Sequence, residues 1–123
     1  MADILKDLYE IVEQRKVQGE EGSYTAYLFE KGLDKILKKV AEEAGETIIA
    51  AKSLEAATER ETGLADVDAL RDAFAGEMAD LLYHLVVLQS ALGVDAKRVE
   101  EVLKERSGKT GNLKAQKNVD KNT

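Results

Sequence analysis

The sequence predicts an all-α fold, an antiparallel helical bundle of four to five helices that is completed by homodimerisation. The 123 residues contain no proline, so the residue that interrupts helices most strongly is absent. Apolar residues recur at spacings of three and four along most of the chain, which is the period of one helix face. Asp or Ser precedes these stretches and Gly follows them, as at helix ends.

Length and composition indicate one domain. We expect it to span residues 1–108, because residues 109–123 hold too few apolar side chains to order themselves and are predicted to be a mobile polar tail. The chain has no cysteine. It therefore has no disulfide framework and no thiol chemistry, which is compatible with a reducing cytoplasm.

Charge and hydropathy exclude several classes of partner. The net charge of −6 argues against nonspecific binding to nucleic acid or to an acidic membrane, since both depend on attraction to phosphates. The N-terminus carries acidic residues where a signal peptide has basic ones. The longest apolar run, residues 81–88, is far shorter than the roughly 20 residues that cross a bilayer. We expect a protein that is neither exported nor membrane-spanning.

The first two helices are predicted from their caps. Asp3 precedes an amphipathic stretch over residues 4–17, where an aspartate is a favourable N-cap. Ser23 or Thr25 then begins a short helix, and Gly32 ends it at the position where glycine is preferred.

A central helix follows, with Asp34 as its predicted N-cap. Its apolar stripe, which we expect to face the core, consists of Ile36, Leu37, Val40, Ala44, Thr47, Ile48 and Ala51. Residues 53–68 are polar and acidic, and Gly63 is the expected break in this segment.

A second long helix is predicted from about Val67 to Leu92, ending at Gly93, and Asp95 caps a last helix. Residues 81–88 are apolar nearly all round, which in a soluble protein indicates contact on several sides. A chain of this size has too few helices to surround that segment. We therefore expect a homodimer or a higher homo-oligomer.

Two pairs of carboxylates lie within the long helices. Glu43 and Glu46 are three residues apart, as are Glu77 and Asp80, so the members of each pair lie about 60° apart around their helix axis. Two such helices packed face to face would bring four carboxylates together, an arrangement that is stable mainly when it holds a hard cation. Ligands that are all oxygen favour Mg²⁺, or Mn²⁺, over zinc.

The angular positions of neighbouring residues suggest their roles. Counted from Val40 at about 100° per residue, Glu43 borders the apolar stripe and Lys39 shares the edge that faces the metal. Glu42 lies farther round the helix. It is therefore less suited to bind the metal and freer to act on a water molecule.

A carboxylate-held cation in a helical bundle commonly serves di-iron redox chemistry or Lewis-acid chemistry on phosphates. Di-iron bundles use Glu-x-x-His pairs, but the only histidine, His84, does not lie three residues after a glutamate. Positive charge lies near the acidic pairs, as a bound polyphosphate requires. It comes from Lys31, Lys35, Lys38 and Lys39. The sequence therefore favours Lewis-acid chemistry on phosphates over di-iron redox chemistry.

Three segments resemble a known family. They are Ser-Tyr-Thr-Ala-Tyr-Leu-Phe-Glu-Lys-Gly at 23–32, the Lys-Lys-Val-x-Glu-Glu-Ala-x-Glu run at 38–46, and Glu-x-x-Asp-Leu-Leu-Tyr-His-Leu at 77–85. Over residues 4 to about 107 the chain closely resembles the phosphoribosyl-ATP pyrophosphatase family, within the all-α nucleoside triphosphate pyrophosphohydrolase (MazG-like) superfamily. The acidic pairs mark the superfamily, and the flanking residues indicate the family.

The resemblance implies Mg²⁺-dependent hydrolysis of the α–β phosphoanhydride of phosphoribosyl-ATP to phosphoribosyl-AMP and pyrophosphate. This reaction is the second step of histidine biosynthesis, and the resemblance implies a cytoplasmic homo-oligomer. The cyclohydrolase of the next step is often fused to such enzymes and uses cysteine-bound zinc. Since this chain has no cysteine, we expect the cyclohydrolase on a separate chain.

The resemblance also implies roles for individual residues. The metal ligands would be Glu43, Glu46, Glu77 and Asp80, and either Glu42 or Glu46 would orient or deprotonate the attacking water. The expected substrate contacts are Ser23, Thr25, Lys31, Lys38, Lys39, Tyr83 and His84. Two of these have structural alternatives, because Tyr83 is also suited to a subunit interface and His84 to the core.

Two other functions stay open. One is a house-cleaning pyrophosphohydrolase of canonical or damaged nucleoside triphosphates, and the other is a non-catalytic helical dimerisation module. The chain also departs from the family in the wide spacing of its acidic motifs across residues 47–76. We expect the extra length to extend a loop or a helix end and to leave the site intact.

Overall fold

The computed structural model describes residues 3–19, 23–60 and 66–108, and all of its regular structure is helical. The helices are α1 (Ile4–Val17), α2 (Tyr24–Lys31), α3 (Leu33–Arg60), α4 (Val67–Ala91) and α5 (Ala96–Ser107). The predicted all-α class is therefore confirmed. The predicted tail and the break at Gly63 lie outside the described residues. Within the described ranges, no helix is both long enough and apolar enough to cross a bilayer.

The predicted caps form. The side chains of Asp3, Ser23 and Asp95 each accept a hydrogen bond from a backbone N–H in the first turn of α1, α2 and α5. Gly32 and Gly93 follow α2 and α4 with φ of 93° and 69°. These left-handed values favour glycine, because a Cβ atom would be strained there.

The prediction that Asp34 caps the central helix was wrong. α3 begins at Leu33, and the N–H of Ile36 donates to the carbonyl of Gly32 at 3.2 Å. Gly32 therefore ends α2 and also starts α3, which places Asp34 in the first helical turn. A carboxylate remains favourable there, because it lies near the positive end of the helix dipole. At its other end α3 continues to Arg60, so the first part of the segment between the acidic motifs is helical.

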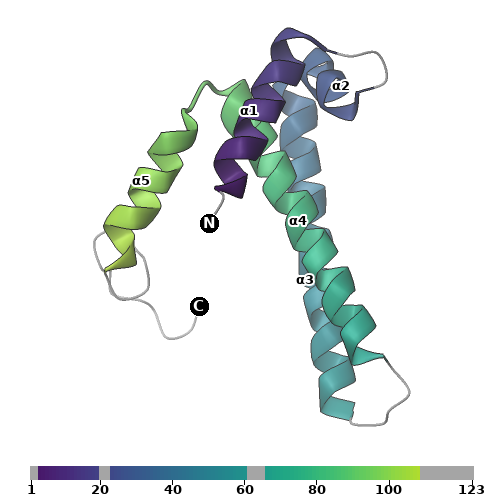
Figure 1. Ribbon diagram of the computed structural model, residues 1–123. Coiled ribbons are helices and arrows are strands. Elements are labelled where there is room, and N and C mark those ends of the chain that lie inside the picture. The colour runs from purple at the N-terminus through teal and green to yellow at the C-terminus, as the bar shows by residue number, and fades with distance from the viewer. Residues whose placement is uncertain (1–2, 20–22, 61–65, 109–123) are drawn as a thin grey trace, which may run out of the picture.

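α3 and α4 form a long antiparallel pair, and α1 and α2 cover one end of it, whereas α5 stands apart and contacts α1 (Figure 1). The hydrophobic core lies at the covered end, where four helices meet. Its buried residues are Val12, Leu28, Ile36, Val86 and Val87. This core fixes α2 and the first turns of α3 against the second half of α4.

Part of the apolar surface of α3 and α4 is open to solvent. The expectation that Leu37 and Ile48 pack into the core was wrong, since these side chains are 45% and 65% exposed. Within one chain, α4 alone packs along most of α3, so part of the apolar stripe has no covering element. Other large apolar residues are exposed on the same two helices, namely Ile49, Met78, Leu82 and Leu85. Homodimerisation, which would cover such a face, stays a prediction.

Candidate functional site

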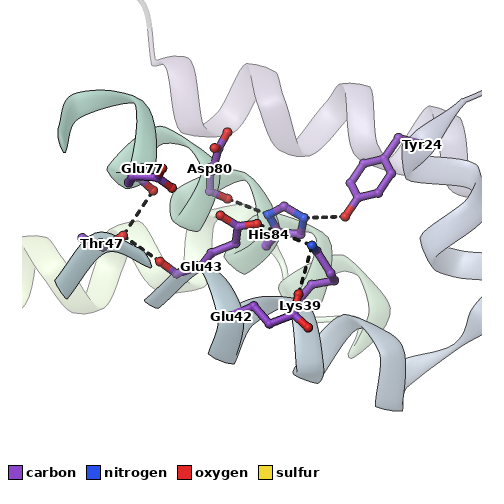
Figure 2. A network of polar contacts seen from close by, with 8 residues as sticks. All are labelled: Tyr24, Lys39, Glu42, Glu43, Thr47, Glu77, Asp80 and His84. Atoms are coloured by element: carbon purple, nitrogen blue, oxygen red, sulfur yellow. Dashed lines mark hydrogen bonds and ion pairs between the residues drawn. The ribbon is translucent and has the colours of Figure 1, made fainter. Parts of the chain in front are cut away.

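Three carboxylates converge between the two long helices. Glu43 comes from α3, and Glu77 and Asp80 come from successive turns of α4. One carboxylate oxygen from each residue lies within 4.8 Å of the others. Figure 2 shows these side chains at the crossing of the two helices. We call these three residues the carboxylate cluster.

The cluster contains buried oxygens that nothing in the described part of the chain satisfies. Glu43 is only 7% exposed, and the Oε2 atoms of Glu43 and Glu77 are buried without a hydrogen-bond partner. Burial raises the pKa of Glu77, and the neighbouring carboxylates of Glu46, Asp80 and Glu43 raise it further. A bound cation would remove this penalty, because it neutralises the negative charge and takes the free oxygens as ligands.

Thr47 ties the two helices together beside the cluster. Its hydroxyl lies 2.8 Å from the carbonyl oxygen of Glu43 and 3.3 Å from that of Glu77. The hydroxyl proton is thus shared between two carbonyl oxygens, one on α3 and one on α4. The backbone that carries the cluster is thereby held at a fixed separation, a role that the apolar stripe did not reveal.

Lys39 supplies positive charge at the edge of the cluster. Its Nζ lies 3.1 Å from Oε2 of Glu42 and 3.6 Å from Oε1 of Glu43. The hydrogen bond to Glu42 raises the pKa of Lys39 and lowers the pKa of the Glu42 carboxyl. Both groups are therefore charged at neutral pH. Glu42 is exposed and is not among the clustered carboxylates.

Glu46 lies at the periphery of this arrangement. Its side chain is exposed, and it reaches Glu77 closely enough for a side-chain hydrogen bond. The group of mutually close ligand atoms contains Glu43, Glu77 and Asp80 and does not include it. The role of Glu46 as a metal ligand therefore stays a prediction. Its place beside Glu77 is compatible with that role.

His84 lies one turn beyond Asp80 and is 5% exposed. Its Nδ1 is 2.7 Å from the backbone oxygen of Asp80, and its Nε2 is 2.8 Å from the hydroxyl of Tyr24. Tyr83 meets the histidine ring edge-on, with centroids 5.3 Å apart. Burial raises the pKa of Tyr83. Both predicted substrate contacts on α4 therefore belong to an aromatic group with Tyr24, and Tyr83 also packs against the hydrophobic core.

The remaining predicted substrate contacts lie on α2 and the first half of α3. The Ser23 hydroxyl caps α2, and Thr25 is buried at 8% exposure. Lys31 is exposed, with its Nζ 5.8 Å from the ring centroid of Tyr27. Lys38 is exposed, and its charge contributes to the lowered pKa of Glu42. Of the predicted lysines, Lys39 is the one whose ion pair reaches the cluster.

Sequence reasoning missed Tyr24 and Thr47. Tyr24 stands between two predicted contact residues, so its place in the 23–32 motif was a usable signal. Thr47 stands four residues after Glu43, the spacing at which a hydroxyl reaches a carbonyl of the preceding turn.

Comparisons with known proteins show which family this chain resembles. The model of a family described as phosphoribosyl-ATP pyrophosphohydrolase matches residues 5–107. A protein of Listeria welshimeri named phosphoribosyl-ATP pyrophosphatase is 44% identical over 117 residues, which cover 95% of this chain and 98% of the relative. Proteins of the same name from Streptococcus sanguinis and Clostridium novyi are 43% and 39% identical, over 95% and 94% of this chain and 98% and 91% of the relatives.

Proposed function

The chain belongs to the phosphoribosyl-ATP pyrophosphohydrolase family, and from this membership we propose that it hydrolyses phosphoribosyl-ATP to phosphoribosyl-AMP and pyrophosphate. We accordingly propose that the chain acts at the second step of histidine biosynthesis and in the cytoplasm. Relatives that carry the enzyme's name align with nearly the whole of this chain, and this extent supports the assignment.

One observation carries the proposal for this site. Glu43, Glu77 and Asp80 bring three carboxylates within reach of a single cation, although two of their oxygens are buried without a hydrogen-bond partner among the described residues. Such an arrangement is costly for a protein that binds nothing there. It is useful for a protein that must hold a divalent ion beside a polyphosphate.

The donor set fits Mg²⁺, with Mn²⁺ as the alternative, because each ligand atom is a carboxylate oxygen. Glu43, Glu77 and Asp80 would hold the ion, and Glu46 would join them through its position beside Glu77. When bound, Mg²⁺ supplies Lewis-acid stabilisation of the negative charge on the phosphate oxygens.

The chain's own residues supply the other requirements of the hydrolysis. Glu42 is exposed and ionised, so it is able to accept a hydrogen bond from a water molecule and to orient it. Glu46 is the alternative group for this task. Lys39 places a permanent positive charge at the edge of the cluster, where it attracts a phosphate. Lys31 and Lys38 are exposed cations that would bind the distal phosphates.

In the proposed reaction, the oxygen of a water molecule forms a bond to one phosphorus of the α–β anhydride. The bond from that phosphorus to the bridging oxygen breaks. Pyrophosphate leaves with the β and γ phosphates, and phosphoribosyl-AMP keeps the α phosphate. The carboxylate that orients the water accepts its proton and then releases it to solvent. Water is the only co-substrate, and no oxidant is needed.

We propose that the chain acts as a homodimer. Ile48 and Ile49 on α3 are 65% and 67% exposed, and Leu82 and Leu85 on α4 are 42% and 40% exposed. These positions lie on the two helices that carry the cluster. A second copy of the same pair would bury them and complete a helical bundle.

The assay is a substrate panel with pyrophosphate detection, run with Mg²⁺ and with excess EDTA. We expect pyrophosphate release from phosphoribosyl-ATP with Mg²⁺, and loss of release in EDTA that returns when Mg²⁺ is restored. ATP and the dNTPs serve as the comparison substrates.

Equal or faster turnover of dNTPs would reassign the chain to house-cleaning of nucleotides. Absence of turnover on every substrate, together with absence of divalent-ion binding by calorimetry, would remove the enzymatic proposal altogether. In that case the exposed apolar face would be the main feature left to explain.

A further inference from the structure

Tyr24 connects α2 to the helix that carries Glu77 and Asp80. It is the first residue of α2, and its hydroxyl lies 2.8 Å from Nε2 of His84, 60 residues away in sequence. The other ring nitrogen of His84 lies 2.7 Å from the backbone oxygen of Asp80. Figure 2 shows the three groups in a row that ends at the carboxylate cluster.

The hydrogen-bond partners assign the protons along this row. A backbone carbonyl only accepts hydrogen bonds, so Nδ1 of His84 must carry the proton that it donates to Asp80. In the neutral ring Nε2 then holds a lone pair, and the Tyr24 hydroxyl donates to it. Each nitrogen of His84 is therefore engaged within the protein.

The tyrosine ring is held in place by its neighbours. It stacks on Tyr27 and on Tyr83, with centroids 6.2 Å and 6.4 Å apart and interplanar angles of 27° and 28°. It also meets His84 edge-on at 5.6 Å. Rings at these separations attract one another, so the hydroxyl is aimed at Nε2 by packing as well as by its hydrogen bond.

The hydroxyl of Tyr24 also faces the charged part of the site. Burial raises its pKa, the charge of Lys39 lowers it, and the charges of Glu43 and Glu42 raise it. The phenol is thus close to residues of α3 as well as α4. It occupies the point where α2 meets both long helices.

We propose that Tyr24 is a positioning residue, which acts through His84 to hold the first turn of α2, with Ser23 and Thr25, against the carboxylate cluster. The role for substrate rests on the proposed function, but the Tyr24–His84 link does not depend on it. Loss of the hydroxyl should loosen α2 while it leaves the ligands on α3 and α4 in place.

The test uses Tyr24→Phe, which removes the hydroxyl and keeps the ring. Tyr27→Phe is the matched control, because Tyr27 is on the same helix and in the same stack but makes no contact with His84 among the described interactions. The chain has one histidine, so two-dimensional ¹⁵N NMR of its ring reports on His84 without assignment of other residues.

In the unmodified protein we expect the pattern of the Nδ1–H tautomer, with Nε2 shifted by an accepted hydrogen bond. In Tyr24→Phe we expect the Nε2 resonance to move toward the position of a nitrogen without a hydrogen bond, and in Tyr27→Phe we expect no such change. An Nε2–H pattern in the unmodified protein, or an unchanged Nε2 resonance in Tyr24→Phe, would overturn the link.

Kinetics test the consequence for substrate. We expect Tyr24→Phe to raise KM for phosphoribosyl-ATP about tenfold with a smaller change in kcat, while Mg²⁺ affinity by calorimetry stays the same. An unchanged KM would refute the positioning role. If Tyr24→Phe instead weakened Mg²⁺ binding and also lowered the melting temperature, the role of Tyr24 would be merely structural and the proposal would be wrong. If the protein does not turn over this substrate at all, the proposed function fails and the NMR result still decides the link.

Discussion

Glu43 and Glu77 lie on different helices, yet each buries its Oε2 atom where the described residues offer that atom no hydrogen-bond partner. With Asp80 they bring three carboxylates close together. In a folded protein without a cation, such a group raises the free energy through both desolvation and charge repulsion. A cation bound between the three carboxylates would remove both costs.

Asp80→Asn should lower kcat about 100-fold to 1,000-fold, since it removes one negative ligand from the electrostatic arrangement that acts on the developing charge. Steady-state kinetics and Mg²⁺ calorimetry measure the two effects. Asp72→Asn, on the exposed surface of the same helix, should keep normal values. A near-normal rate in Asp80→Asn would contradict the assignment of the site.

Glu77→Gln should raise the melting temperature of the metal-free protein. Burial and three nearby carboxylates raise the pKa of Glu77, which means that its charged form is unfavourable in the fold and that neutralising it stabilises the fold. Mg²⁺ should stabilise the unmodified protein, because a ligand that binds only the folded state adds to its stability. It should stabilise the variant much less. Thermal unfolding with and without Mg²⁺ measures both effects, and equal stabilisation of the two proteins would show that Glu77 does not hold the ion.

Glu42→Gln should reduce kcat about 100-fold and leave Mg²⁺ affinity within about twofold of normal, because Glu42 is charged but lies outside the cluster. Glu55→Gln is the control, since Glu55 also pairs with a lysine three residues before it on α3. If Glu42→Gln is fully active and Glu46→Gln is not, the water-orienting role belongs to Glu46.

Lys39→Met should raise KM about tenfold, because it removes the cation that lies between Glu42 and Glu43 and that would attract a phosphate. Lys52→Met is the control. Lys52 pairs with a glutamate three residues later, as Lys39 does, but it lies on the exposed surface of α3, so its loss should leave KM unchanged. Equal KM values for the two variants would indicate that Lys39 serves only to neutralise its neighbours.

Ile48→Glu should convert a dimer into a monomer, because its side chain is 65% exposed in the isolated chain and would be buried against a second copy. Light scattering coupled to size-exclusion chromatography measures the mass, and circular dichroism checks that the helices are retained. Val17→Glu, at a position that is 79% exposed on α1, should remain dimeric. A monomeric unmodified protein would contradict the proposed assembly.

Much of the local structure could be predicted from the sequence. Asp3, Ser23 and Asp95 cap their helices as expected, because an N-cap depends on a side chain and on the backbone within three residues of it. Asp34 failed as a cap for the same local reason, since the carbonyl of Gly32 already begins α3.

Part of the site could also be predicted. The spacing of three residues places Glu77 and Asp80 on one face of α4, and they do converge. The same spacing predicts the pair Glu43 and Glu46, yet Glu43 is in the cluster and Glu46 is exposed at its edge. Helical periodicity gives angles around one axis. It does not give the rotation of that helix against its neighbour.

By itself, the sequence determined that the chain is helical, the N-caps Asp3, Ser23 and Asp95 and the spacing of the carboxylates within each long helix, because these depend on residues within one or two turns of one another. Only the tertiary structure decided that Glu43 is buried, that Tyr24 reaches His84, that Thr47 lies between two carbonyls and that Ile48 is open to solvent. These outcomes depend on how α2, α3 and α4 are rotated and shifted against one another. That packing results from the shapes of many distant side chains together, which no local pattern contains.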